Sequence, residues 1–134
     1  MVCSEDQAAR ISPLVSVITP VFNCCRFIEQ TIESVRAQTH TDWELICVDD
    51  CSSDGSIALV QSFLEQDSRI QLIRLAVNSG AAVARNVAIE AARGRYIAFL
   101  DSDDVWLPDK LECQLEYMQK TNAPFCFSAY ARID

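Results

Sequence analysis

Residues 96–104, Tyr-Ile-Ala-Phe-Leu-Asp-Ser-Asp-Asp, join the most apolar run of the chain to an acidic turn. An apolar run of this length, closed by turn-forming Asp and Ser, predicts a buried strand at the centre of a sheet. Pro108 follows the turn and suits the first turn of a helix. The apolar face of that helix would be formed by Leu111, Leu115 and Met118. This stretch therefore predicts a strand, a polar loop and a helix in succession.

The same alternation of strand and helix extends through the rest of the chain. Short apolar runs predict further strands at 14–19, 43–48, 70–75 and 125–130. Between the earlier strands, apolar residues recur at helical spacing, and Gly94 is expected to end the third helix in a left-handed cap. Alternation of this kind selects an α/β fold with a mostly parallel sheet and helices on both faces.

Length and composition indicate a globular domain. The chain has 134 residues, 50% of them hydrophobic, and its 19 acidic and 11 basic side chains give a net charge of −8. No apolar run approaches the ~20 residues of a membrane span. The acidic balance argues against a nucleic-acid partner and against docking on an anionic membrane, because both call for a basic face. We expect a polar tail over 1–13 and one domain over 14–134, a fragment of a longer protein truncated after about five strands.

The seven cysteines do not predict a disulfide framework, because their number is odd and the polar N-terminus lacks a secretion signal. Reduced thiols and a cytoplasmic location are therefore expected. A zinc site is not supported, since Cys47-x3-Cys51 has no second cysteine pair and His40 lies apart from it.

Three polar clusters are expected at one edge of the sheet, because ligands of open α/β sheets bind outside the carboxyl ends of the strands. The clusters are residues 20–23, the acids Asp49, Asp50 and Asp54, and residues 101–104. Two acidic clusters on one edge would repel each other, and a bound cation would resolve the conflict. Asp101 and Asp103 offer the hard oxygen ligands that magnesium or manganese prefers. The alternative is that these acids only cap helices and favour turns.

Arg85 lies one turn into the helix that Asn78-Ser79-Gly80 opens. A cation beside a helix N-terminus could face a diphosphate, and the alternative is a solvated arginine on the helix surface. Phe22 could stack on a base or simply pack. The chain has neither a Gly-x-Gly-x-x-Gly loop nor a Walker-type loop, and its single His40 gives a Ser-His-Asp arrangement little support.

Four motifs occur in a characteristic order. They are VSVITPVFN (15–23), WELICVDDCSSDGS (43–56), NSGAAVARN (78–86) and GRYIAFLDSDDVWLPDKL (94–111). Together they resemble family 2 glycosyltransferases of the GT-A type. The match covers about residues 14–130, which correspond to the N-terminal, nucleotide-binding half of the family's catalytic domain. The resemblance implies a Rossmann-like fold.

The resemblance also implies a nucleobase site. Pro20 and Phe22 would border the base, Asp50 would hydrogen-bond it, and Asp49 would support that loop. Asn23, beside Phe22, belongs to the same expected nucleotide site. The family usually has Tyr where this chain has Phe22, a change that keeps the stacking face and loses the hydroxyl.

A diphosphate and cation site is implied next to it. Arg85 would lie near the base and phosphates, Asp101 near the ribose, and Asp103 would bind a divalent cation, manganese or magnesium, with Asp101 beside it. Ser102 completes the expected nucleotide-binding residues, and Asp104 would orient the loop.

The implied reaction is sugar transfer from a nucleotide-diphosphate donor, expected to be a UDP-sugar, to a hydroxyl of a saccharide or lipid-linked acceptor, with inversion. Cell-surface polysaccharide or glycolipid synthesis at the cytoplasmic face of a membrane is implied, with any peripheral membrane association made through parts outside this chain. The general base is expected beyond Asp134, so these residues are expected only to bind nucleotide.

Three other functions fit parts of the sequence. Residues 100–105, LDSDDV, match the D-x-D-x-[TV] signature of haloacid-dehalogenase-like phosphatases, although here the motif follows the fourth expected strand and not the first. A receiver-type signalling domain would carry a phosphoacceptor Asp after its third strand, where this chain has Ala76-Val77-Asn78. A non-catalytic nucleotide-binding or interaction module is the third alternative.

Overall fold

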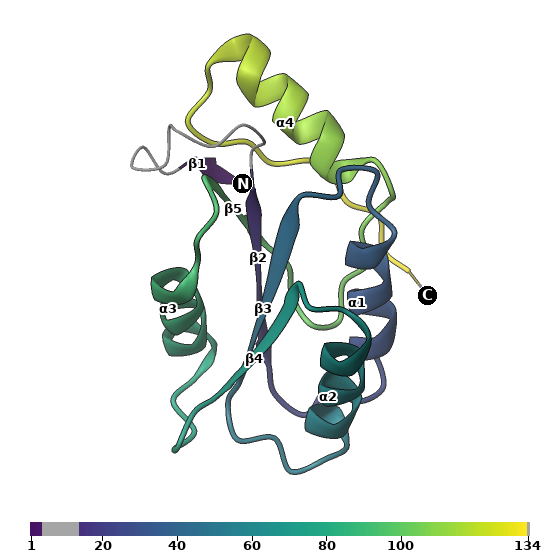
Figure 1. The fold of residues 1–134 in the computed structure, drawn as a ribbon, viewed down its shortest axis with the longest axis vertical. Coiled ribbons are helices and arrows are strands. Elements are labelled where there is room, and N and C mark those ends of the chain that lie inside the picture. Colours follow the sequence, from purple (N-terminus) through teal and green to yellow (C-terminus); the bar gives the residue numbers. More distant parts are fainter. Residues whose placement is uncertain (4–13, 134) are drawn as a thin grey trace.

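A computed structural model describes residues 1–3 and 14–133 (Figure 1). Its sheet has the strand order β1-β5-β2-β3-β4. The parallel strands are β2 (Val15–Val21), β3 (Trp43–Asp49), β4 (Ile70–Arg74) and β5 (Tyr96–Phe99), and β1 (Val2–Cys3) runs antiparallel to β5. The helices are α1 (Ile28–Arg36), α2 (Ser56–Gln66), α3 (Ala81–Ala91) and α4 (Lys110–Thr121). The predicted α/β fold with a mostly parallel sheet is confirmed.

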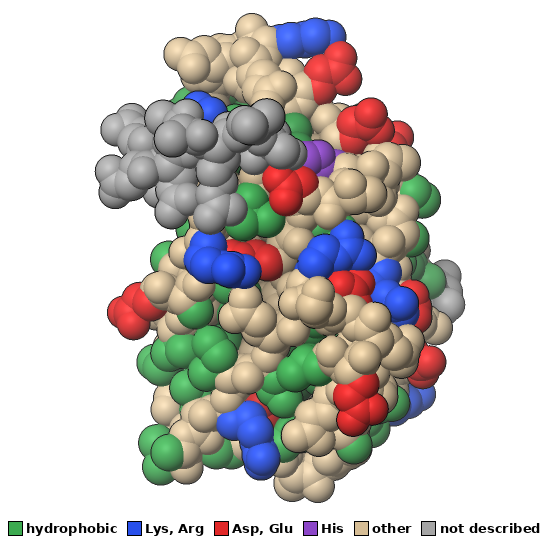
Figure 2. Space-filling model, in the orientation of Figure 1, with side chains coloured by type: hydrophobic (Ala, Val, Ile, Leu, Met, Phe, Trp, Pro, Cys, Tyr) green, Lys and Arg blue, Asp and Glu red, His purple; other side chains and the backbone are tan. Residues whose placement is uncertain are grey.

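Helices cover both faces of the sheet (Figure 1). Helix α3 packs on one face, where the small side chains of Ala84 and Ala88 are fully buried in one cluster with Ile18, Ile46 and Val48. Helices α1 and α2 cover the other face (Figure 1), and the buried side of α4 joins the same apolar core. None of the described helices is long and apolar enough to span a bilayer. Figure 2 shows acidic and basic side chains interspersed over one face of the described chain.

The strand predicted at 125–130 is wrong. Only Phe125 forms a single bridge, and the backbone of Cys126 exchanges hydrogen bonds with that of Met1 at 2.9 and 3.3 Å. Phe127 and Tyr130 are 89% and 97% exposed. An apolar run becomes a strand only where a neighbouring strand supplies a ladder of hydrogen bonds. Here Met1 is a single partner residue, so no ladder forms.

Strand β5 lies closer to the sheet edge than predicted. Its neighbours are β2 and the two-residue β1, which pairs only with Tyr96 and Ile97. Phe99, beyond the reach of β1, is 45% exposed. Strand β1 falls inside the tail predicted over 1–13, and residues 4–13 of that tail lie outside the described residues.

Gly94 does not end α3 in a left-handed cap, because its φ is not positive. Its role is close packing. A Cβ at this position would lie 2.6 Å from Ser16 Oγ, 2.7 Å from Ser16 N and 2.8 Å from Leu14 O. The missing side chain lets the turn before β5 lie directly against the start of β2.

A buried carboxylate holds the same turn. Glu44, 2% exposed on β3, accepts hydrogen bonds from Ser16 Oγ at 2.6 Å and from the Arg93 backbone N–H at 2.7 Å. The guanidinium of Arg93 also pairs with it at 3.0 Å, and Gln71 donates to it at 3.2 Å. This network fixes the α3–β5 turn on the sheet and thereby positions the loop after β5. It is not apparent from the sequence.

Candidate functional site

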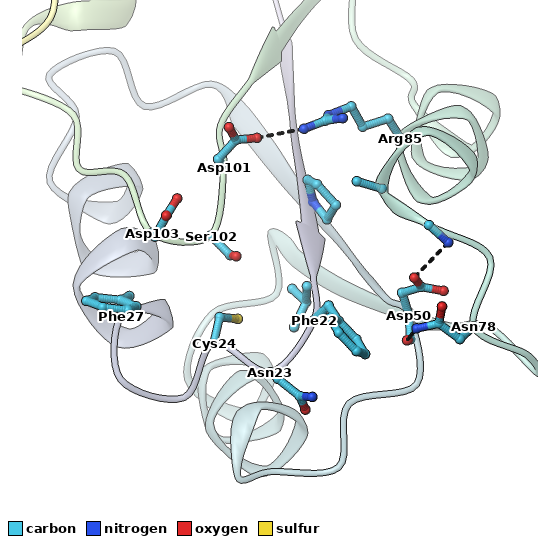
Figure 3. Close-up of a pocket in the computed structure, with 14 residues that line it drawn as sticks. Phe22, Asn23, Cys24, Phe27, Asp50, Asn78, Arg85, Asp101, Ser102 and Asp103 are labelled. Atoms are coloured by element: carbon cyan, nitrogen blue, oxygen red, sulfur yellow. Dashed lines mark hydrogen bonds and ion pairs between the residues drawn. The ribbon is translucent and has the colours of Figure 1, made fainter.

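A cleft opens at the carboxyl ends of β2, β3 and β5, with a volume of about 520 Å³ (Figure 3). Eight of the nine predicted site residues line it: Pro20, Phe22, Asn23, Asp50, Arg85, Asp101, Ser102 and Asp103. The ninth, Asp49, does not. Six lining residues were not predicted as site residues: Val21, Cys24, Phe27, Asn78, Gly80 and Ala81. All of these except Cys24 and Phe27 lie within the motifs quoted above, which is the signal that could have found them.

Asp50 holds the beginning of α3. Its carboxylate accepts hydrogen bonds from the backbone N–H groups of Ser79 at 2.6 Å and Gly80 at 2.8 Å. Its own carbonyl accepts one from the Asn78 amide at 3.0 Å (Figure 3). Asp50, in the loop after β3, thus holds the two residues that immediately precede α3. Gly80 has a φ of +91°, a left-handed conformation that favours glycine. The 4% exposed Asp50 therefore orients one wall of the cleft.

The two other acids of this region also accept backbone hydrogen bonds. Both carboxylate oxygens of Asp49, which is 1% exposed, lie 3.3 Å from Ser52 N. Asp54 accepts from the backbone N–H groups of Ser56 at 2.9 Å and Cys25 at 3.2 Å. The Ser56 hydroxyl, followed by these N–H groups, holds the pKa of Asp54 well below its usual range. Backbone hydrogen bonds from within the protein therefore offset part of the negative charge of this acidic region.

The remaining acidic cluster is different in kind. Asp101, Asp103 and Asp104 are exposed and offer carboxylate oxygens that all lie within 4.8 Å of one another. The turn is closed by a hydrogen bond from Asp104 N to Asp101 O at 3.1 Å. Partial burial, together with the nearby charges of Asp103 and Asp101, raises the pKa of Asp104. A cluster of hard oxygen donors fits a divalent cation such as Mg²⁺ or Mn²⁺.

Arg85 reaches the acidic loop across the cleft. Its Nη2 lies 2.9 Å from Asp101 Oδ1, which joins α3 to the loop after β5 (Figure 3). The loop is also tied to α1, because the Thr31 hydroxyl donates to the Ser102 carbonyl at 2.9 Å. The guanidinium of Arg85 and the carboxylate of Asp101 therefore come from two different elements, α3 and the loop after β5, and each element has hydrogen bonds of its own to the rest of the protein.

Two aromatic side chains of the cleft are available for contact. Phe22 and Phe27 are 52% and 46% exposed (Figure 3). The loop that carries Phe22 is braced through its neighbour Asn23, which has a left-handed φ of 45°. The Asn23 side-chain oxygen accepts from Ser53 N at 2.8 Å, and its backbone N–H donates to Ser52 Oγ at 3.0 Å. The walls of the cleft are thus held by the protein's own hydrogen bonds.

Comparisons with known proteins agree on one family. The family model described as "Glycosyl transferase family 2" matches residues 16–134. The chain is 55% identical over 119 residues to TuaG of Bacillus subtilis, which is named as a glycosyltransferase of teichuronic acid biosynthesis. The match covers 89% of this chain and 47% of TuaG. It is 46% identical over 121 residues to the Escherichia coli UDP-Glc:alpha-D-GlcNAc-diphosphoundecaprenol beta-1,3-glucosyltransferase WfgD, covering 47% of it with 90% of its own length.

Solved structures show the same fold. S. aureus TarS in complex with UDP-GlcNAc superposes with a TM-score of 0.76 at 29% identity, over 81% of this chain and 32% of that one. The mannosyltransferase PcManGT from Pyrobaculum calidifontis, in complex with GDP-Man and Mn²⁺, gives a TM-score of 0.75 at 27% identity, over 79% and 32%. The chain spans about half the length of TuaG and WfgD.

Proposed function

The chain belongs to glycosyltransferase family 2, and from this premise we propose that its cleft binds the nucleotide diphosphate of a UDP-sugar together with a divalent cation. The observation that carries the proposal is the contrast between the two acidic regions. Asp49, Asp50 and Asp54 accept backbone hydrogen bonds. The carboxylates of Asp101, Asp103 and Asp104 lie within 4.8 Å of one another, the first two line the cleft, and none of the three accepts a backbone hydrogen bond among the described residues. The second group is the one suited to a cation.

The base would lie between Phe22, Pro20 and Asp50. Phe22 presents an exposed ring on which a base can stack. An ionised carboxylate only accepts hydrogen bonds, and each oxygen of Asp50 keeps a lone pair beyond the one that a backbone N–H uses. Its natural partner is a ring N–H, which uracil and guanine carry and cytosine and adenine lack. UDP is favoured further because WfgD is named for UDP-Glc and a TarS structure contains UDP-GlcNAc.

The diphosphate would lie between Arg85 and the acidic loop. Asp101 and Asp103 would hold the cation, Mn²⁺ or Mg²⁺, and Arg85 would contribute a guanidinium, which pairs well with phosphate. When bound, the cation supplies Lewis acidity to the leaving diphosphate. The protein's own residues bind and orient the donor, and the braced loops keep that geometry before the donor arrives.

The full-length protein would then transfer the sugar to a hydroxyl of a saccharide or lipid-linked acceptor, with inversion, in cell-surface polysaccharide synthesis at the inner face of the membrane. The names of TuaG and WfgD support this acceptor class. Such a transfer needs a general base. We assign none within this chain and expect these 134 residues to bind the donor without transferring it.

Calorimetric titration tests the proposal. The chain should bind UDP in the presence of Mn²⁺, and chelation of the metal should weaken that binding at least tenfold. UMP is the matched control, because it keeps the base and lacks the second phosphate that the cation would bridge. UDP binding that is unaffected by chelation, or UMP binding as tight as UDP binding, would overturn the proposal.

A further inference from the structure

The guanidinium of Arg85 already has a partner in the protein without ligand. Its Nη2 donates to Asp101 Oδ1 at 2.9 Å, and no other hydrogen bond of this side chain is found among the described residues (Figure 3). Both side chains remain accessible, at 37% exposed for Arg85 and 53% for Asp101. The pair joins two elements that are otherwise braced separately, α3 through Asp50 and the loop after β5 through Thr31.

Asp101 therefore has two competing partners. It is one of the three carboxylates whose oxygens lie within 4.8 Å of one another, and it is the one that Arg85 neutralises. While the ion pair is closed, the cluster offers a cation less negative charge. In the same state, the guanidinium of Arg85 is paired with a carboxylate and not with a phosphate.

We infer that Arg85 and Asp101 form an exchangeable ion pair that couples cation binding to diphosphate binding. A divalent cation that takes Asp101 releases Arg85, and the released guanidinium becomes available to the phosphates of the nucleotide. A diphosphate that takes Arg85 releases Asp101 to the cation in turn. The inference rests on the proposed function and assigns to Arg85 a positioning role in the free protein as well as a ligand-binding role.

The coupling is expected to be modest. Exposed ion pairs contribute little to stability, and the Arg85–Asp101 pair has one hydrogen bond, so its opening should change an affinity by about 2- to 5-fold. A pair of this strength is easily exchanged, as a binding site requires. By linkage, the factor by which cation binding strengthens diphosphate binding equals the factor by which diphosphate strengthens cation binding.

Two variants that remove the same charge distinguish the effect of breaking the ion pair from the effect of removing a negative charge. Asp101→Asn and Asp103→Asn each delete one carboxylate of the cluster, and only Asp101 pairs with Arg85. With all metal chelated, both should tighten UDP binding by removing negative charge. Asp101→Asn should tighten it about 3-fold more, because it also frees Arg85. When each substitution is made separately in the Arg85→Gln background, the two variants should bind UDP with the same affinity.

A second measurement uses Mn²⁺ alone, without nucleotide. Arg85→Gln should tighten Mn²⁺ binding about 3-fold, since Asp101 is then unpaired. Arg74→Gln is the matched control, because Arg74 is exposed on β4, carries the same charge and does not line the cleft. In the presence of both Mn²⁺ and UDP, Arg85→Gln should instead weaken UDP binding. The exchange predicts this reversal of sign.

The outcomes separate this inference from the proposed function. Equal metal-free UDP affinities of Asp101→Asn and Asp103→Asn, or equal Mn²⁺ affinities of Arg85→Gln and Arg74→Gln, would overturn the ion-pair exchange and leave Mn²⁺-dependent UDP binding intact. Absence of Mn²⁺-dependent UDP binding in the unmodified chain would overturn both. Circular dichroism of each variant shows that the comparison is made between folded proteins.

Discussion

Replacement of Asp50 by Asn should destabilise the fold, although it changes one atom of the side chain. Asp50 is 4% exposed, and its two carboxylate oxygens accept the Ser79 and Gly80 N–H groups at 2.6 and 2.8 Å. Asparagine keeps one acceptor oxygen and turns an NH₂ group toward the other N–H. Hydrogen bonds to a charged group contribute about 1.5–3 kcal/mol each. With one such bond lost, Asp50→Asn should lower the free energy of unfolding by about 2 kcal/mol and the melting temperature by about 7 °C.

The control for Asp50→Asn is Asp103→Asn, which removes the same charge from an exposed side chain of the same cleft. This variant should stay within about 0.5 kcal/mol of the original chain, as surface substitutions usually do. Urea unfolding at neutral pH, followed by circular dichroism, measures both variants. Equal stability of Asp50→Asn and the original chain, or equal losses in both variants, would refute the assignment of Asp50 as the anchor of the segment before α3.

Three further predictions concern the rest of the molecule. Gly94→Ala should cost about 2–3 kcal/mol in urea unfolding, because its Cβ would meet the backbone N of Ser16 at 2.7 Å; a loss below 0.5 kcal/mol would contradict the close packing. The folded-state pKa of Asp54 is depressed, so its stabilisation is present above the ordinary value of 3.8 and is lost as the pH falls below it. The stability difference between the original chain and Asp54→Asn should therefore shrink as the pH is lowered from neutral through that value, and a constant difference would contradict the sign. Burial raises the pKa of Cys47 to about 12, so iodoacetamide at neutral pH should modify this thiol only after unfolding, as mass spectrometry of the labelled peptides would show.

The layer arrangement was predictable because apolar periodicity directly reports which faces are buried. The apolar face of α4 lies where its spacing places it. The strand predicted at 125–130 failed for a reason that the segment itself does not contain, since a strand needs a neighbour and the residues that flank β5 come from the N-terminus. The role of Gly94 was also misjudged. Its requirement arises from backbone 80 residues earlier in the chain, at Leu14.

The position of the site was predictable from the sequence. Which of its acids accept backbone hydrogen bonds, and which remain available to a ligand, was not. Asp50 and Asp103 both follow apolar strands in acidic loops, and the sequence offers nothing that separates them. Their difference depends on the loop before α3, which turns two N–H groups onto Asp50 and none of them onto Asp103. The ion pair of Arg85 likewise depends on how α3, packed on β2 and β3, is placed relative to the loop after β5. The phosphatase and receiver alternatives receive no support, because the family shown is a glycosyltransferase family.

The most direct measurement is paramagnetic broadening of backbone amide signals by Mn²⁺ in the presence of UDP. At a small fraction of one equivalent of Mn²⁺, the amides of residues 101–104 should broaden first, and the nearby amide of Arg85 should follow. Asp103→Ala should abolish this pattern while the spectrum stays that of a folded protein. Broadening that centres instead on residues 49–54, or on Glu112 and Glu116 of α4, would contradict the claim that the loop after β5 holds the cation.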